Sequence, residues 1–485
     1  MFFYGVEAAT LEVGSKKPYS TIQSAIIVAS TSDTVLVYPG TYTENITFDG
    51  KAITVKSANG PGVTFIDGSA SDNVVTFAYG EGQGSVLEGF TIKNGFGSGI
   101  FCYSSSPVIT NCTITENSTY AYGGGISCSY SSSPVITNCT ITGNTAELDG
   151  GGIDCYSSSP VITNCTITGN TAYSSGGGID CYSSSPVITN CTITGNTATF
   201  GGGIYCWVSS PVITNCTISR NTTDYDGGGI YCIYSSSPVI TNCIISVNSA
   251  GYDGGGIYCI YFSPTVITNC TIFGNTASQH GGGIYCSASS PTVKNSILWE
   301  DAATVGGNEI YPDSSTITVT YSDVQGGWAG TANINADPLF VGIWNLHLQT
   351  GSPCENTGTT AGAPQYDFEG NPRLAPVGGD NMPDMGADEL AIKRLLWKHT
   401  SGAANIWKLD SSDTFDFVNF KVYGPFAGWT PIDYHRNADG TARLLWENTN
   451  GAANIWKLDS SDTFDWVSFK VYGPFAGWTP LEYEE

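Results

Sequence analysis

Two aspartates at equivalent positions of neighbouring sequence repeats are the first candidates for chemistry. Asp154 and Asp180 each follow Gly-Gly-Gly-Ile and precede Cys-Tyr-Ser-Ser-Ser. If each repeat forms one coil of a stacked β structure, their backbones lie about 4.8 Å apart. Carboxyl groups on adjacent rungs can share a proton or hold Ca²⁺, and a separation of about 5 to 5.5 Å is that of retaining glycosidases.

The repeat region offers these aspartates few partners for acid–base catalysis. It contains one arginine, Arg220, and one histidine, His280, with Lys294 near its end. A lyase needs a basic side chain near the scissile bond, and none repeats beside the aspartates. We therefore expect solvated surface carboxylates at Asp154 and Asp180, with a cation site and a catalytic pair as the alternatives.

Aromatic residues occupy the position of these aspartates in the later repeats. Because side chains alternate along a β-strand, Ile and Cys of Gly-Ile-Tyr-Cys should point inward and Tyr outward. An outward aromatic stripe can stack on sugars or on a neighbouring protein, and the alternative is stacking that only stabilises the sheet. The predicted binding residues of this stripe are Tyr205, Trp207, Tyr231, Tyr258 and Tyr285.

The C-terminal region carries a second aromatic set in two near-identical copies, which start at Arg394 and Arg443. Each copy predicts a few antiparallel strands, and exposed tryptophans there would serve as sugar platforms or self-association contacts. Asn437 and Asp439 precede Gly440, an order that fits either a Ca²⁺ loop or an ordinary turn. The six equivalent tryptophans are Trp397, Trp407, Trp429, Trp446, Trp456 and Trp478.

The elements that position these residues follow from a repeat of about 26 residues between positions 96 and 296. Each repeat contains three short β-rich pieces separated by Gly, Ser or Asn, which predicts a three-sided coil. Stacked coils form parallel sheets around a core of Ile, Val and Cys. The isoleucine after the glycines recurs at Ile100, Ile126, Ile153, Ile179, Ile204, Ile230, Ile257 and Ile284.

Asparagines and cysteines repeat in the same register. We interpret the asparagines as structural ladders of stacked amides at turns. The sequence has 16 cysteines, and all except Cys354 fall in two rows of the repeat, such as Cys155 and Cys165. Small buried hydrophobic groups are the expected role of these rows, and disulfides between adjacent coils are the alternative.

Composition limits the possible partners. Lys plus Arg number 17 against 42 Asp plus Glu, a net charge of -25, which opposes nucleic-acid binding and is compatible with Ca²⁺. No apolar run reaches the roughly 20 residues of a transmembrane helix. Residues 1–10 read like the end of a secretory signal with a cleavage site near Ala8, so we expect export.

These motifs resemble a known family. The Gly-Gly-Ile and Asn-x-Ala repeats are similar to those of bacterial secreted pectin-lyase-like β-helix proteins with polymorphic outer-membrane-protein-like repeats. The segment 19–26 looks like the family's cap helix. Two later segments, one that runs from Asp337 to Cys354 and one that runs from Asp384 to Glu389, look like its closing portion. The C-terminal copies resemble β-propeller blades, although two blades cannot close a propeller within one chain. The resemblance implies a right-handed parallel β-helix, whose enzymes use carboxylate clusters on acidic polysaccharides.

The sequence therefore predicts an all-β fold, a right-handed parallel β-helix solenoid with a small C-terminal antiparallel β module. The expected function is that of an extracellular structural or adhesive bacterial protein that forms a homo-oligomer, filament or surface layer, or docks on a cell-surface or extracellular polysaccharide. The alternative is a polysaccharide lyase or glycoside hydrolase with a C-terminal carbohydrate-binding module. The segments are 1–10 (signal remnant or arm), 11–95 (cap and first coils), 96–300 (regular coils), 301–390 (closing coils) and 391–485 (two Trp-rich repeats).

Overall fold

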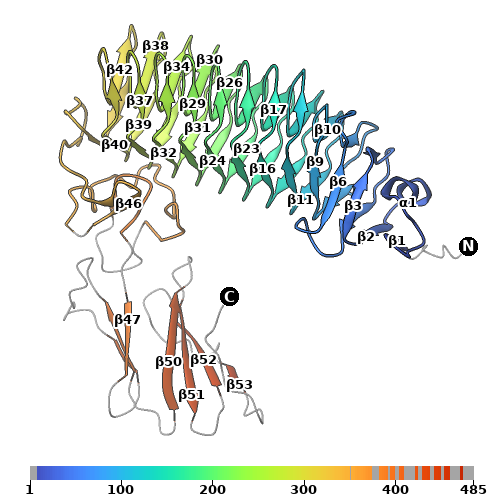
Figure 1. Cartoon of the computed structure of the whole chain (residues 1–485). Coiled ribbons are helices and arrows are strands. Elements are labelled where there is room, and N and C mark those ends of the chain that lie inside the picture. Colours follow the sequence, from blue (N-terminus) through green and yellow to red (C-terminus); the bar gives the residue numbers. More distant parts are fainter. Residues whose placement is uncertain are drawn as a thin grey trace, which may run out of the picture. The chain divides into compact units, whose positions relative to one another are not determined.

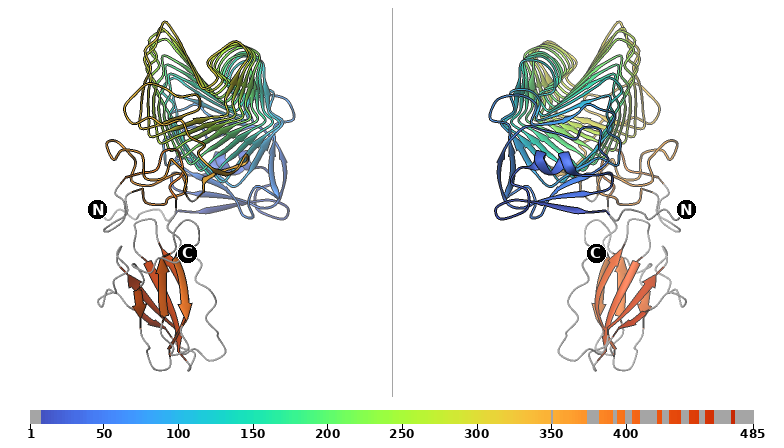
Figure 2. Two further views of the ribbon diagram at one scale, coloured as in Figure 1. Left: turned by 90° about the vertical axis from the view of Figure 1, so that its left-hand side faces the viewer. Right: turned by 90° about the vertical axis from the view of Figure 1, so that its right-hand side faces the viewer.

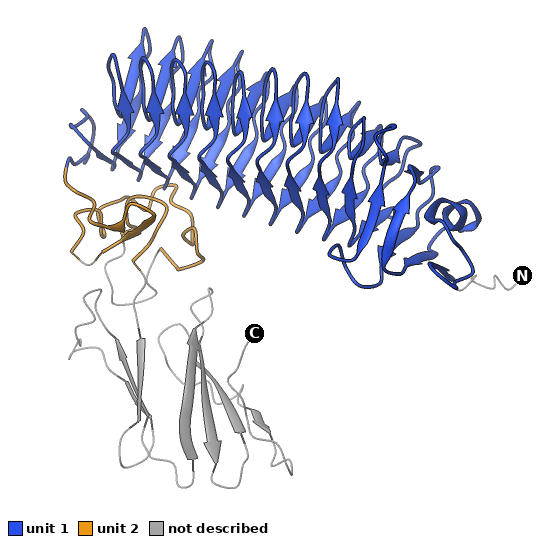
Figure 3. Cartoon of the chain, in the orientation of Figure 1, with its two compact units in different colours: residues 1–335 blue, residues 336–485 orange. Residues whose placement is uncertain are grey.

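The computed structural model describes residues 8–349, 351–373 and 382–390, and beyond these only the backbone of strands between residues 394 and 472. The chain divides into two compact units, residues 1–335 and residues 336–485 (Figure 3). No helix in the described part of the chain is long and apolar enough to cross a membrane.

Unit 1 is a stack of parallel coils, which confirms the predicted solenoid (Figure 1). One coil shows the pattern: β18 (Ile153–Tyr156), β19 (Val161–Thr163), β20 (Thr166–Thr168) and β21 (Thr171–Ala172). These strands belong to four parallel sheets, which we call sheets C, A, B and D; they contain 11, 13, 12 and 8 strands respectively. Viewed along the stack, successive coils lie almost exactly behind one another (Figure 2).

The register between coils follows the sequence repeat residue by residue. Strand β18 pairs with β22 (Ile179–Tyr182) so that Ile153 faces Ile179 and Cys155 faces Cys181. The Ile and Cys rows are fully buried and form one continuous core. Alternation along each short strand therefore separates core from surface, as the pattern predicted.

The two asparagine rows have different roles. Asn164 lies between sheets A and B with φ 53°, a left-handed conformation that asparagine tolerates well. Asn170 is buried, and its amide donates to Asn196 Oδ1 at 3.0 Å and to the Ile141 carbonyl at 2.9 Å. The same bonds recur from coil to coil, so the predicted amide ladder is confirmed for the row that contains Asn170.

Glycine triplets are required where the chain turns back onto sheet C. A Cβ atom on Gly152 would lie only 2.5 Å from the Gly178 carbonyl oxygen. The two backbones therefore approach more closely than any side chain allows. This is the physical reason for the Gly-Gly that precedes the inward isoleucine in seven of the eight regular coils.

The N-terminal end of the core is closed by one short helix, α1 (Ile22–Val28), beside β1 (Thr10–Val13). Thr21 is its N-cap, and its hydroxyl accepts from the Ser24 backbone N–H. Ile22, Ala25 and Ile26 are buried against the first coils, which confirms the predicted cap helix. Sheet A ends at β43 (Thr318–Thr320), and sheet B ends at β44 (Asp323–Val324).

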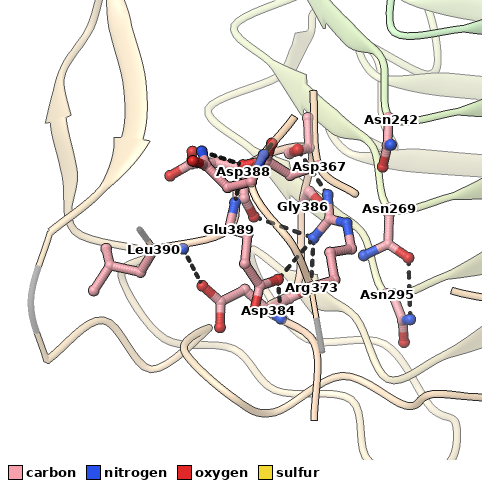
Figure 4. A network of polar contacts seen from close by, with 12 residues as sticks. Asn242, Asn269, Asn295, Asp367, Arg373, Asp384, Gly386, Asp388, Glu389 and Leu390 are labelled. Carbon is pink, nitrogen blue, oxygen red and sulfur yellow. Dashed lines mark hydrogen bonds and ion pairs between the residues drawn. The ribbon is translucent and has the colours of Figure 1, made fainter. Parts of the chain in front are cut away.

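Unit 2 begins with a small antiparallel pair, β45 (Phe340–Gly342) and β46 (Asn345–Leu348). Its described core is organised around Arg373, whose side chain is completely buried (Figure 4). The guanidinium donates to the carbonyls of Gly386 and Ala387 at 2.9 and 2.7 Å and pairs with Glu389 at 3.1 Å. The predicted closing segment is thus held by one buried cation.

The C-terminal copies form antiparallel strands, as the sequence predicted. Three strands make one sheet and four make another. The strand that ends the first copy, β50, pairs with β51 of the second copy, so the two copies are not separate blades. The strands are β47 (Arg394–Lys398), β48 (Ala404–Lys408), β49 (Lys421–Tyr423), β50 (Trp429–Arg436), β51 (Ala442–Asn448), β52 (Ala453–Leu458) and β53 (Lys470–Tyr472).

Candidate functional site

Asp154 and Asp180 are adjacent, but they are not surface groups. They face each other in register on β18 and β22, as expected from the repeat. Each is only 3% exposed, so the expectation of solvated carboxylates is wrong. Alternation does point them away from the main core, but the outer face of sheet C is itself covered.

The cover is the turn that leads into each glycine triplet. A Cβ atom on Gly150 would lie 2.6 Å from the Cβ of Asp154, and Gly176 is equally close to Asp180. The turn therefore folds directly over the outer side chains of sheet C. It is fixed between coils by Asp149, whose Oδ1 accepts from the Ser175 backbone N–H at 2.9 Å.

Burial sets the charge state of the aspartate pair. Burial, followed by the charge of Asp149, raises the pKa of Asp154 well above its ordinary value. Burial, followed by the charge of Asp154, raises the pKa of Asp180 in the same way. Oδ1 of Asp180 has no hydrogen-bond partner within the described structure. Burial and mutual repulsion therefore disfavour a state in which both carboxyl groups of the pair are charged.

The tyrosines at this position are buried too. The exposed fractions of Tyr205, Tyr231, Tyr258 and Tyr285 lie between 6% and 9%. Consecutive rings stack at centroid distances of 5.0, 4.8 and 4.8 Å. These four residues therefore form a second small core under the glycine turns, and the prediction that their rings are outward-facing platforms for sugars is wrong.

The accessible aromatic row lies at the end of the sheet C strands and was missed by the sequence reasoning, apart from Trp207. We call it the strand-end ladder. Neighbouring rings along it are 4.5 to 6.1 Å apart between centroids. Its signal in the sequence is the aromatic residue before Ser-Ser in most repeats. Its members are Tyr103, Tyr130, Tyr156, Tyr182, Trp207, Tyr234 and Tyr261.

Comparison with protein families agrees with this geometry. Residues 15–171 and 150–298 match the family model described as the right-handed β-helix region. The chain belongs to the right-handed β-helix family. No curated protein sequence matches it significantly.

Solved structures similar to this β-helix protein include enzymes and a viral domain. Pectin methylesterase PemA from Erwinia chrysanthemi is 11% identical, with a TM-score of 0.28, over 69% of this chain and 93% of that one. The A-module of the mannuronan C-5 epimerase AlgE6 from Azotobacter vinelandii is 16% identical, with a TM-score of 0.33, over 65% and 91%. The receptor-binding domain of the siphovirus 9NA tailspike is 11% identical, with a TM-score of 0.26, over 96% and 98%.

The right-handed β-helix also contains a second buried acid pair that the sequence reasoning missed. Asp301 takes the place of asparagine at the end of the amide ladder, where its Oδ1 accepts from the Asn275 amide at 2.8 Å. Burial raises the pKa of Asp301 to about 7. Burial, followed by the charge of Asp301, raises the pKa of Glu309 to about 11. The signal was the single Asp in an otherwise regular Asn row.

The cysteines of this β-helix protein are all buried and form no disulfide in the described structure, which agrees with their expected role as small core groups. In the row of Cys165, the backbone N–H groups from Cys139 to Cys243 donate to the sulfur of the next coil, as from Cys165 to Cys191 Sγ at 3.4 Å, and that of Cys270 donates to Ser296 Oγ.

The remaining predicted site residues lie outside the part of the β-helix protein whose side chains are described. Asn437, Asp439 and Trp478 fall in segments without described structure. Trp397, Trp407, Trp429, Trp446 and Trp456 lie on strands of which only the backbone is described. The C-terminal Ca²⁺ loop and the tryptophan platforms therefore remain predictions.

Proposed function

We propose that this β-helix protein is an adhesive protein that binds an extended neutral glycan along the strand-end ladder. The observation that carries the proposal is the continuity of this ladder, which presents one aromatic ring on each of seven consecutive coils. Its tyrosines are 39% to 56% exposed, in contrast to the buried row on the same strands. A polymer with a repeating unit is the natural ligand for a repeating surface.

The ladder offers hydroxyl groups and ring edges to such a polymer. Because the rings of Tyr156 and Tyr182 stack with an interplanar angle of 11°, their faces are largely occupied by each other. What remains accessible is the phenol edge, which combines an apolar rim with a hydroxyl donor and acceptor. Next to five of the seven rings the chain continues in a serine turn, such as Ser157 and Ser183, with more hydroxyls. Polyhydroxylated sugars match this pattern of donors and acceptors.

Charge selects a neutral glycan over an acidic one. The net charge of the chain is -25, and it has only 17 basic residues among 485. A polyuronate would approach against the field of the protein, with few cations to neutralise it. The proposal therefore favours neutral polymers, and binding should depend little on salt.

The burial of Asp154 and Asp180 favours adhesion over hydrolysis. A catalytic acid must come within about 3 Å of the bond it protonates, and both carboxyls are 97% covered by the glycine turns and neighbouring tyrosines. Their raised pKa is the one feature that favours the alternative of a glycoside hydrolase, because a general acid must be protonated at neutral pH. That alternative predicts glycan turnover that is lost in Asp154→Asn and Asp180→Asn variants.

Assembly and location complete the proposal. We infer an extracellular, bacterial-surface location, with the tandem C-terminal repeats as a docking module for a cell surface or a neighbouring subunit. Helix α1 covers the N-terminal end of the core, which disfavours growth of a filament through that end. Light scattering after size exclusion tests assembly, and a Trp397→Ala plus Trp446→Ala variant tests the role of the repeats in it.

Affinity electrophoresis through gels that contain single polysaccharides tests the proposed function. The panel contains neutral polymers such as xylan, glucomannan and soluble cellulose derivatives, beside pectate and alginate. We expect at least one neutral polymer to retard the wild-type protein. A Tyr156→Ala plus Tyr182→Ala variant should bind about tenfold more weakly, because about 1.4 kcal/mol is a modest loss for two contact residues.

The matched control replaces two exposed tyrosines outside the ladder, Tyr120 and Tyr173, which are 71% and 61% exposed. This variant should bind like the wild-type protein. Equal retardation of the ladder variant, a preference for polyuronates, or turnover of the retained polymer would each contradict the proposal.

A further inference from the structure

Three metal-ligating side chains converge in unit 2, far from the strand-end ladder in the sequence. They are His347 on β46, Glu369 in the turn after Asp367, and Asp388 in the closing segment. One ligand atom from each lies within 4.8 Å of the other two. The closest pair, His347 Nε2 and Glu369 Oε1, is 2.9 Å apart.

Each of these groups is held in place by the backbone around it. Asp367 Oδ1 accepts from the backbone N–H groups of Glu369 and Asn371 at 2.8 and 2.7 Å, which fixes the turn that carries Glu369. Asp388 Oδ2 accepts from the Leu348 N–H at 2.9 Å, so the segment of Asp388 is tied to the strand of His347.

The imidazole of His347 has a partner on its other side. Asn345 Oδ1 contacts His347 Nδ1, and Glu369 Oε1 lies 2.9 Å from Nε2; both oxygens accept, so without a metal each ring nitrogen can donate a proton. When Nδ1 keeps its proton, a metal ion can replace the proton on Nε2 and take its lone pair. A hydrogen bond that fixes the second ring nitrogen is typical of histidines that bind metals.

We propose that His347, Glu369 and Asp388 bind a divalent transition metal ion, with Zn²⁺ as the best match. Zn²⁺ takes nitrogen and carboxylate ligands at about 2.0 to 2.2 Å in a tetrahedron, which places the ligand atoms about 3 to 3.6 Å from one another. The His347–Glu369 pair, at 2.9 Å, is slightly closer than this separation, and small side-chain rotations would open it and bring in the third group. Water occupies the fourth position.

Other common ions fit this donor set less well. Ca²⁺ takes six to eight oxygen ligands, and Mg²⁺ prefers carboxylates with several waters in an octahedron. An imidazole nitrogen with two carboxylates is instead the ligand type of Zn²⁺ and its first-row neighbours.

The role of the ion follows from the sequence distances it bridges. His347 and Glu369 are 22 residues apart, and Asp388 follows 19 residues after Glu369 (388 minus 369). Unit 2 is without the repeated coils of unit 1 in its described part, so it cannot draw on their repeated interactions for stability. A metal that joins three such segments removes freedom from the unfolded chain and thereby stabilises this region.

Metal binding to the full-length protein tests the proposal. After treatment with EDTA and dialysis, the protein is titrated with Zn²⁺ by calorimetry, and the bound metal is measured by elemental analysis. The His347→Gln and Glu369→Gln variants should each bind one equivalent fewer than the wild-type protein. Wild-type thermal stability should rise with Zn²⁺, and that of the variants should not.

A matched control comes from His280, whose Nδ1 lies 3.1 Å from Asp253 Oδ1. This pair has a histidine and a carboxylate at a similar distance but is not part of a three-ligand group, so His280→Gln should leave the stoichiometry unchanged. Circular dichroism checks that the variants remain folded. As a second measurement, Co²⁺ in the wild-type site should give the intense visible absorption of four-coordinate cobalt.

The possible outcomes distinguish a metal site at His347, Glu369 and Asp388 from the absence of one. Equal Zn²⁺ stoichiometry in wild-type protein and in both folded variants would overturn the proposal, as would a six-coordinate Co²⁺ spectrum or preferential binding of Ca²⁺. Loss of one equivalent in His347→Gln and Glu369→Gln, with none lost in His280→Gln, would establish the site.

Discussion

The regular coils of unit 1 and the closing segment of unit 2 are stabilised in opposite ways. In the coils, each interaction is repeated: the bond from Asn170 to Asn196 has the same form and length as that from Asn196 to Asn221. In the closing segment, Arg373 alone connects Glu389 with the carbonyls of Gly386 and Ala387. Stability is therefore distributed in one region and concentrated in the other.

This difference has a consequence for where function can lie. A regular coil can tolerate loss of a surface ring, because neighbouring rungs keep its backbone in place. The closing segment cannot lose its central cation without leaving the buried carboxyl group of Glu389 without its counter-charge. We therefore expect binding surfaces, whose side chains can change without loss of the fold, on the coils. We expect structural sites, whose side chains cannot change, in the closing segment.

The largest effect is expected from Arg373→Met. The substitution keeps the volume of the side chain but removes the cation that pairs with Glu389 and that donates to the carbonyls of Gly386 and Ala387. Removal of one partner from a buried ion pair costs about 3 to 5 kcal/mol. Limited proteolysis should show cleavage between residues 336 and 390 while the coils stay intact. Unchanged resistance would contradict the picture of a single hub.

A smaller loss is expected from Asn196→Ala in the middle of the amide ladder. Asn196 is buried, its Oδ1 accepts from the Asn170 amide, and its own amide donates to the Ile167 carbonyl. Buried groups left unpaired cost about 1 to 3 kcal/mol each. Urea unfolding measures the loss. As the control, Asn190→Gly at an exposed left-handed turn should change stability by less than about 0.5 kcal/mol. Equal effects of the two substitutions would contradict separate roles for the two rows.

A gain in stability is expected from Asp180→Asn at neutral pH. Because the folded-state pKa values of Asp154 and Asp180 are raised, the folded protein keeps protons that the unfolded chain has released above about pH 4. Wild-type stability therefore falls as pH rises from about 4 towards the raised pKa values. The variant should be more stable by about 1 to 3 kcal/mol at pH 7 and equal at pH 3. Urea midpoints at both values of pH measure this, and a destabilised variant at pH 7 would contradict the assigned charge state.

The stability contributed by Asp301, at the end of the amide ladder, should respond to pH over a defined range. Since the pKa of Asp301 is raised to about 7, its contribution to stability decreases between about pH 4 and pH 7. An Asp301→Asn variant, which restores the repeat residue, should lose this decrease and gain about 1 kcal/mol at pH 7. Thermal unfolding across this pH range is the measurement. An unchanged pH profile would show that Asp301 is not protonated in the fold.

The smallest effect on stability is expected from Tyr182→Ala in the strand-end ladder. Stacked aromatic pairs contribute about 0.5 to 1.5 kcal/mol, and this ring lies between Tyr156 and Trp207. Thermal unfolding should shift slightly, whereas glycan affinity should fall clearly. A large loss of stability would instead assign the ladder a structural role.

The sequence predicted the coils well because every repeat places the same types of residue at the same positions of a coil. Inward Ile and Cys, the parallel register and the amide ladder followed from spacing, and the cap helix followed from the family resemblance. It failed where one layer of structure covers another: alternation placed Asp154 and Tyr205 outside the main core, but could not reveal that the glycine turn before each strand folds over them. The Arg373 hub and the ligands around His347 escaped prediction because their partners meet only through tertiary contacts.

Hydrogen–deuterium exchange of the full-length protein, with and without a retained neutral glycan, tests the central claim most directly. The account predicts slower exchange at the turns that follow the strand-end ladder, around residues 103–106, 156–159 and 182–185, with little change around Asp154. Protection confined to the C-terminal strands between residues 394 and 472 would show that the tandem repeats, and not the coils, bind the glycan.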